Sequence, residues 1–222
     1  QMAGLKNVSI PRRDRHGNAN AMTVTTFDLL TEIGSGGYAA GDAVYTAYLS
    51  PVDPAMDGTK FSQWRESWQR YRVRRCSLIY EPTCPATMAG AIAGCVFNDP
   101  MTELGSLGPT QSERVVTSEP GADTWTVWSA GAISSFAVAG QDPYFIEPNG
   151  SDIRLSVQGK IALICVADIP AGTALGNVYM VCETEYYLPS LSDTLGTGAV
   201  ARLDSTWTAS EAAMRRAGSL PG

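Results

Sequence analysis

The strongest constraint on the fold is a two-residue alternation in residues 174–189, ALGNVYMVCETEYYLP. Successive side chains of an extended strand point to opposite faces, so an alternating pattern predicts a strand with one buried face. One face would carry Val178, Met180, Cys182, Thr184, Tyr186 and Leu188, and the other Tyr179, Val181, Glu183, Glu185 and Tyr187.

Seven other stretches also have strand character, because they are rich in β-branched and apolar residues and end at Gly- or Pro-containing breaks. There is no βαβ rhythm and no internal repeat. The sequence therefore predicts an all-β fold, an antiparallel sandwich or barrel of eight strands. The seven stretches are residues 21–33, 42–50, 71–82, 88–99, 123–130, 151–158 and 159–169.

Two segments predict short helical insertions. In residues 59–71, TKFSQWRESWQRY, the aromatic residues Phe61, Trp64, Trp68 and Tyr71 fall on one helical face. We interpret this stripe as core packing rather than a ligand site. Residues 109–118 predict a second short helix, and residues 129–150 fit either a loop or an irregular strand.

The composition agrees with a β-domain much of whose surface is covered. Only 17% of the 222 residues are charged, and Gly and Pro are plentiful. The apolar runs are too short to span a bilayer, so no membrane partner is expected. The five cysteines form no C-x-x-C pair and mostly lie in apolar runs, which predicts a reducing compartment and no disulfide framework.

Charge is unevenly distributed along the chain. Residues 1–20 carry four basic residues and one acid, whereas residues 21–201 carry nine basic and 19 acidic residues. Residues 1–21 also lack periodicity. A basic arm of this kind is typical of phosphate binding, with a solvated tail as the alternative. The candidate RNA-binding residues are Lys6, Arg12, Arg13 and Arg15.

Catalytic signatures are missing from the sequence. The single histidine, His16, lies in the basic arm, and a catalytic base must be held rigidly against its nucleophile. No zinc-ligand spacing and no phosphate-binding glycine loop occurs. We therefore predict no enzyme activity and no catalytic residues, and a His-rich jelly-roll enzyme of the cupin type is nearly excluded.

Two charged clusters are candidates for binding. NDPMTE places Asp99 and Glu103 just after an apolar run, where carboxylates could bind a hard cation such as calcium; a solvated turn is the alternative. Arg70, Arg72 and Arg74 alternate along a predicted strand. They could meet phosphate or a neighbour's carboxylates, or form a solvated strand edge.

The order of these features resembles the shell domain of small icosahedral RNA-virus coat proteins of the tombusvirus and sobemovirus type. The resemblance rests on AVYTAYLSPVDP, on the stretch from Lys60 to Asp99, and on GNVYMVCETEYYLPS, and it covers roughly residues 22–190. It implies an eight-stranded antiparallel jelly-roll sandwich with short helical insertions. The apolar runs 71–82 and 88–99 would then lie in opposite sheets, with Cys84 in the turn between them.

The resemblance also implies a function. Residues 1–21 would be an N-terminal basic arm facing RNA, 22–190 the shell domain, and 191–222 a C-terminal extension or hinge. Many copies would enclose viral RNA in a virion, after assembly in the host cytoplasm. Calcium between subunits would be bound by Asp99, Glu103 and, from a neighbour, Asp142. Removing divalent ions at raised pH would then swell the particle.

An alternative function is a calcium-dependent carbohydrate-binding β-sandwich. Trp125 and Trp128 would be its binding platform. Their spacing puts them on opposite faces of a regular strand, which argues against a shared platform.

Overall fold

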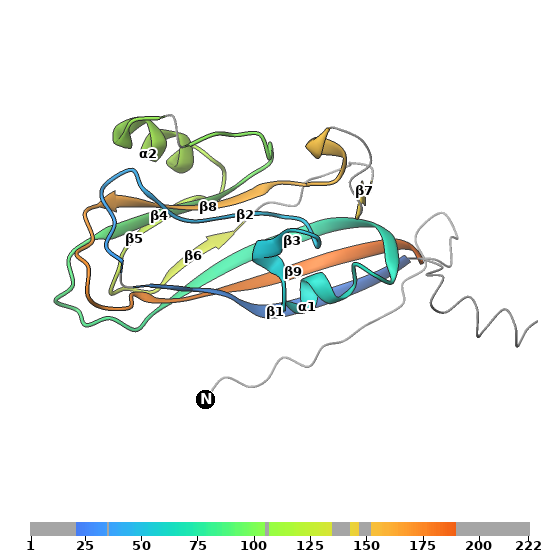
Figure 1. Cartoon of the computed structure of the whole chain (residues 1–222), viewed down its shortest axis with the longest axis horizontal. Coiled ribbons are helices and arrows are strands. Elements are labelled where there is room, and N and C mark those ends of the chain that lie inside the picture. The colour runs from blue at the N-terminus through green and yellow to red at the C-terminus, as the bar shows by residue number, and fades with distance from the viewer. Residues whose placement is uncertain (1–20, 35, 105–106, 135–142, 147–151, 190–222) are drawn as a thin grey trace, which may run out of the picture.

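The computed structural model describes residues 21–34, 36–104, 107–134, 143–146 and 152–189. Nine strands in this part of the chain form two sheets that face each other (Figure 1). The elements in chain order are β1 (Ala21–Ile33), β2 (Ala43–Tyr48), η1 (Pro54–Met56), α1 (Lys60–Gln63), β3 (Trp68–Pro82), β4 (Ala91–Phe97), α2 (Pro109–Thr117), β5 (Asp123–Thr126), β6 (Gly131–Ser134), β7 (Tyr144–Phe145), η2 (Ile153–Leu155), β8 (Lys160–Ala167) and β9 (Gly176–Pro189).

One sheet has the order β1-β9-β3-β6, with β7 also paired to β3, and the other has the order β2-β8-β4-β5. Every strand pair is antiparallel. The chain crosses repeatedly between the sheets, which is the connectivity of a jelly roll. The predicted all-β sandwich is confirmed. The apolar runs 71–82 and 88–99 do lie in opposite sheets, as β3 and β4.

The predicted helix over residues 59–71 is wrong beyond its first turn. Helix α1 ends at Gln63, and the chain joins the sheet at Trp68, opposite Pro189. Strand pairing to β9 overrides the helical periodicity, because it places Tyr71 in the core. The aromatic residues still pack as expected: the rings of Trp64 and Trp68 each lie 6.3 Å from that of Tyr186.

The predicted strand over residues 151–158 is also wrong, since its described part contains the short helix η2. This segment instead supplies hydrogen bonds to Val73, at the bulge in β3 between Val73 and Arg75. The Gln158 amide accepts a hydrogen bond from Val73 N (2.6 Å) and donates one to Val73 O (2.7 Å). Strands β6 and β7 lie in the stretch 129–150 that the sequence left ambiguous. The short helix predicted at 109–118 is confirmed as α2.

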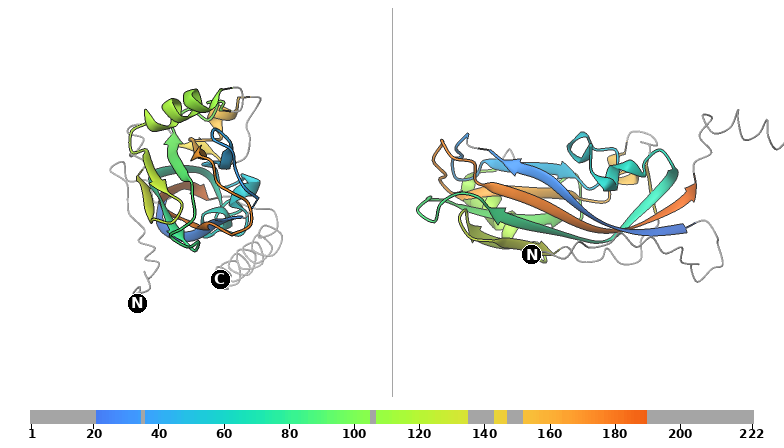
Figure 2. Two further views of the ribbon diagram at one scale, coloured as in Figure 1. Left: turned by 90° about the vertical axis from the view of Figure 1, so that its left-hand side faces the viewer. Right: turned by 90° about the horizontal axis from the view of Figure 1, so that it is seen from below.

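The two sheets are covered differently on their outer faces. Helix α2 lies on the four-stranded sheet and forms a second small core with β4 and β8 (Figure 1). Strands β4 and β8 are therefore almost continuously buried. Strands β3 and β9 alternate between buried and partly exposed residues, and they lie on the side away from α2 (Figures 1 and 2). Leu188 breaks the predicted pattern, because its backbone φ is 54° and its side chain is exposed.

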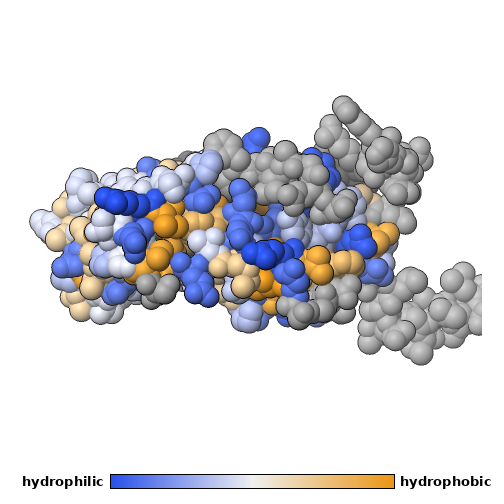
Figure 3. Space-filling model, turned by 90° about the horizontal axis from the view of Figure 1, so that it is seen from above, coloured by the Kyte–Doolittle hydropathy of each residue, from blue (hydrophilic) through white to orange (hydrophobic). Residues whose placement is uncertain are grey.

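The surface on the α2 side is a mosaic of hydrophilic and hydrophobic patches (Figure 3). Among the described residues, no helix is long and apolar enough to cross a membrane.

A buried carboxylate joins β1 to the turn before β3. Asp28 is only 6% exposed, and its oxygens accept hydrogen bonds from Lys60 N (2.9 Å) and Phe61 N (3.3 Å). These are backbone donors at the start of α1 that the short helix cannot satisfy itself. Asp28 thus fixes where the chain turns before entering the five-stranded sheet.

Replacing this carboxylate tests its contribution. We expect Asp28→Ala to lower the free energy of unfolding by about 1–3 kcal/mol, because two buried N–H groups lose their acceptor. Denaturant unfolding followed by tryptophan fluorescence measures the change. The matched control is Asp57→Ala, which removes an exposed ion pair with Arg65 and should cost less than about 1 kcal/mol. Equal losses in both variants would contradict the assigned role.

Candidate functional site

The acidic corner after β4 is the first candidate site. Asp99 and Glu103 both have exposed side chains there. The Asp99 carboxylate already has a cationic partner, because Arg154 Nε lies 3.3 Å from Oδ1 and Nη2 lies 3.3 Å from Oδ2. Arg154 and the backbone N–H of Met101, which donates to Oδ1, hold the pKa of Asp99 below its ordinary value.

Two further contacts fix this corner, and one of them adds a second cation. Asp152 accepts a hydrogen bond from Arg154 N (3.0 Å) at the start of η2. Lys160 Nζ donates to the carbonyl of Thr102 at 2.9 Å. Nothing in the local sequence NDPMTE indicated Arg154, which lies 55 residues further along the chain.

The described residues of this chain do not by themselves fit a calcium site. Calcium requires six to eight oxygen ligands, and both oxygens of Asp99 face a guanidinium. Across the described ranges no group of three or more His, Cys, Asp or Glu side chains could hold a metal ion. The third predicted ligand, Asp142, lies outside the described residues.

The arginines of β3 form the second candidate site. Strand β3 pairs with β9 along its length, and on its other side β7 pairs with residues 70–71 and β6 with residues 77–80. Between them Gln158 bonds to Val73, so within the described residues Arg72 and Arg74 lie at a gap in the strand pairing on that side. Arg72 Nη2 and Arg74 Nε each lie 2.8 Å from Glu185 Oε2, and Tyr187 also donates to this oxygen. A carboxylate partner was expected from a neighbour, whereas Arg72 and Arg74 find one, Glu185, within the same chain.

This cluster changes the acidity of Glu185. Burial alone would raise the pKa of Glu185, but hydrogen bonds from Arg74, Tyr187 and Arg72 outweigh it and lower the pKa to about 2. Burial, followed by the hydrogen bond to Glu185, raises the pKa of Tyr187 to about 12. Arg70 lies beside the cluster, with its guanidinium carbon 4.4 Å from the centre of the Phe145 ring.

The two tryptophans proposed as a carbohydrate platform do not share a surface. Trp125 is 6% exposed, whereas Trp128 is 44% exposed. The Trp125 ring packs on Tyr80 and against the backbone of Gly131, where an added Cβ would lie 2.2 Å from the ring. Trp125 is therefore part of the core, which argues against the carbohydrate-binding alternative.

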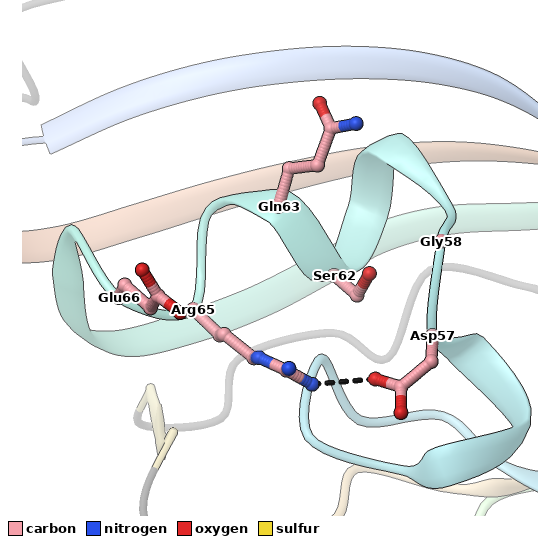
Figure 4. A pocket seen from close by; sticks show the side chains of 6 residues that line it. All are labelled: Asp57, Gly58, Ser62, Gln63, Arg65 and Glu66. Atoms are coloured by element: carbon pink, nitrogen blue, oxygen red, sulfur yellow. Dashed lines mark hydrogen bonds and ion pairs between the residues drawn. The ribbon is translucent and has the colours of Figure 1, made fainter.

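A shallow pocket of about 360 Å³ lies between η1 and α1 (Figure 4). Its lining is polar, and Arg65 reaches across it to Asp57 at 2.6 Å. The pocket holds no nucleophile paired with a base, so its residues do not suggest catalysis. Lys6, Arg12, Arg13 and Arg15 lie outside the described residues, and their assignment to RNA remains a prediction.

Burial of Glu185 among two arginines predicts a specific acid sensitivity. The pKa of Glu185 is lower in the folded chain (about 2) than its ordinary value of 4.5. Its stabilising contribution is therefore complete above about pH 4.5 and is lost as the pH falls toward 2. We expect Glu185→Gln to cost about 1–3 kcal/mol of unfolding free energy at pH 7 and progressively less below pH 4.5.

Urea unfolding of the monomeric chain at several pH values between 2 and 7 measures this difference. Glu81→Gln, an exposed residue of β3 opposite Asn177, controls for removal of a carboxylate outside the arginine cluster. If the difference in unfolding free energy between the wild type and Glu185→Gln stays constant with pH, the assignment is contradicted.

Comparisons with known proteins agree with this architecture. The model of the family described as viral coat protein (S domain) matches residues 7–191. No curated protein sequence matches the chain.

Solved structures are similar in fold. The capsid of giant freshwater prawn Macrobrachium rosenbergii nodavirus, in a semi-empty virus-like particle, has a TM-score of 0.68 and 22% identity, over 77% of this chain and 94% of that one. The structure of Mud crab tombus-like virus has a TM-score of 0.68 and 20% identity, over 85% of this chain and 93% of that one. The structure of Cocksfoot mottle virus has a TM-score of 0.60 and 12% identity, over 77% of this chain and 96% of that one.

Proposed function

The chain belongs to the viral coat protein family as its S domain, and from this premise we propose that its copies assemble into an icosahedral shell enclosing viral RNA. Membership makes it a structural, non-enzymatic component of the virus particle. The observation that carries the proposal is the jelly roll itself, which aligns over most of its length with proteins solved as virus capsids or virus-like particles. Assembly in the host cytoplasm is part of the proposal.

RNA contact is assigned to the basic arm. The arm contains only one acidic residue beside its four basic residues, Lys6, Arg12, Arg13 and Arg15, whereas residues 21–201 have a strong excess of acidic residues. Contacts to phosphates are independent of sequence and sensitive to salt, which suits the enclosure of a long RNA. The division into arm, shell domain (22–190) and extension (191–222) remains a prediction.

Purified chain tests the proposal directly. We expect particles in the megadalton range by light scattering and negative-stain microscopy, with nucleic-acid absorbance that resists added nuclease. A small oligomer without RNA under all assembly conditions would contradict the proposed function.

An arm variant separates RNA binding from assembly. Replacing Lys6, Arg12, Arg13 and Arg15 by Gln should lower the packaged RNA. If all four residues contact phosphates, the slope of the logarithm of the RNA-binding constant against the logarithm of salt concentration should also become shallower by about three units for single-stranded RNA. Arg114→Gln, on the exposed side of α2, removes one charge outside the arm and is the control.

Calcium between subunits is the finer part of the proposal. An ion at Asp99 and Glu103 would need carboxylates from a neighbour, such as Asp142, and would compete with Arg154. Sedimentation of particles at pH 8 with and without a chelator tests for this ion. Swelling of wild-type particles, absent in Asp99→Asn, is expected for calcium bridging. Unchanged sedimentation of the wild type would remove calcium from the proposal.

A further inference from the structure

Among the described residues, no helix covers the outer face of the five-stranded sheet as α2 covers the other sheet. The apolar half of this face consists of Phe27, Leu29, Ile79, Tyr179 and Val181. Leu29 and Ile79 lie on either side of Tyr179 in register across three strands, and Phe27 lies opposite Val181. Leu29 is 55% exposed and Ile79 is 37% exposed.

These residues form a contiguous surface rather than scattered exposed side chains. Cross-strand neighbours have Cβ atoms about 5 Å apart, so the row from β1 through β9 to β3 is continuous. The Phe27 and Tyr179 rings stack with their centres 5.3 Å apart. Contiguous apolar patches on a protein surface mark sites of interaction, whereas single exposed residues do not.

The charged half of the same face lies further along the same strands. It consists of Arg72, Arg74, Arg75, Glu183 and Glu185. Arg75 is exposed and lies opposite Glu183 in register, while Arg72 and Arg74 are bound to Glu185. With Arg70 included, strand β3 holds four of the nine basic residues in the span 21–201, which has 19 acidic residues.

The distribution of charge on this face indicates which kind of partner binds it. Glu185 already pairs with Arg72 and Arg74, so the exposed Arg75 is the cation that the charged half offers to the acidic surface of another copy of this otherwise acidic protein. RNA would match the arginines but not the adjoining apolar half, because phosphate contacts do not bury aliphatic side chains. A protein surface matches both halves, as an apolar centre with a polar rim does in protein interfaces.

We infer that the outer face of the β1-β9-β3 sheet is a contact between copies of this chain, with its apolar half buried against the neighbour and its exposed Arg75 facing acidic residues there. This inference rests on the proposed function and assigns one surface to it. The contact is heterologous, since Arg75 meets a different, acidic surface on the neighbour, and such contacts build rings of subunits where the rotation between subunits closes.

Substitutions of exposed residues test the contact in the full chain. Leu29→Lys should raise the protein concentration needed for particle formation at least tenfold, measured by light scattering and sedimentation velocity. Leu155→Lys is the matched control, because Leu155 is 47% exposed but lies in η2, outside this face. Leu29→Thr keeps strand propensity and should give a weaker defect of the same sign.

Arg75→Glu tests the charged half and should impair assembly at low salt more than at high salt. Thermal unfolding of dilute, unassembled chain is measured for every variant. Unchanged monomer stability with impaired assembly supports the inference. A loss of monomer stability in Leu29→Lys, without an assembly defect beyond it, would instead show that the chain covers this face itself.

Other outcomes overturn the inference in distinguishable ways. Particles that form equally well from wild type, Leu29→Lys and Arg75→Glu overturn the inference and leave the proposed function intact. Normal particles with reduced RNA content in Arg75→Glu would assign the face to RNA. Wild-type chain that stays monomeric at all concentrations overturns the proposed function and the inference together.

Discussion

The antiparallel ladder between β3 and β9 runs from Trp68 opposite Pro189 to Pro82 opposite Gly176, through the middle of the five-stranded sheet. Because strand side chains alternate, this single register decides what faces the core and what faces outward. It places Tyr71 and Tyr186 side by side in the interior. It also brings Arg72 next to Glu185 on the outer surface.

The interior side of this ladder is held by tyrosine hydroxyls as well as by apolar packing. Tyr71 donates to the carbonyls of Leu49 and Ser156, and Tyr80 to those of Val127 and Leu175. Tyr186 donates to Phe61 O at 3.0 Å. Each of these three tyrosine hydroxyls is therefore satisfied by a loop or helix backbone, and these bonds attach the connecting segments to the sheet.

The asymmetry between the two sheets links the fold to assembly. Helix α2 gives the four-stranded sheet a second core on its outer face, so β4 and β8 need no partner there. The five-stranded sheet keeps an outer face with apolar and charged halves. The proposed assembly of copies requires surfaces such as this face, which no described helix covers, and the low charge content of the sequence is consistent with it.

Local pattern predicted the strands well because alternation directly reports which residues one sheet face buries. The predicted strands at 21–33, 42–50, 71–82 and 159–169 correspond closely to β1, β2, β3 and β8. The prediction of a helix over residues 59–71 failed for a physical reason. The aromatic spacing of this segment suits a helix, yet several of the same side chains fill the core from α1 and the start of β3. The pairing of that segment with β9, more than 100 residues away, was decisive.

By itself the sequence determined the fold class, the acidic body with a basic arm, and the absence of catalytic motifs, because these depend on composition and short-range periodicity. Only the tertiary structure decided the partners of charged residues. Asp99 meets Arg154, and Glu185 meets Arg72 and Arg74, across separations of 55 to 113 residues. Such ion pairs depend on sheet register and loop packing, which bring together residues that no local pattern connects.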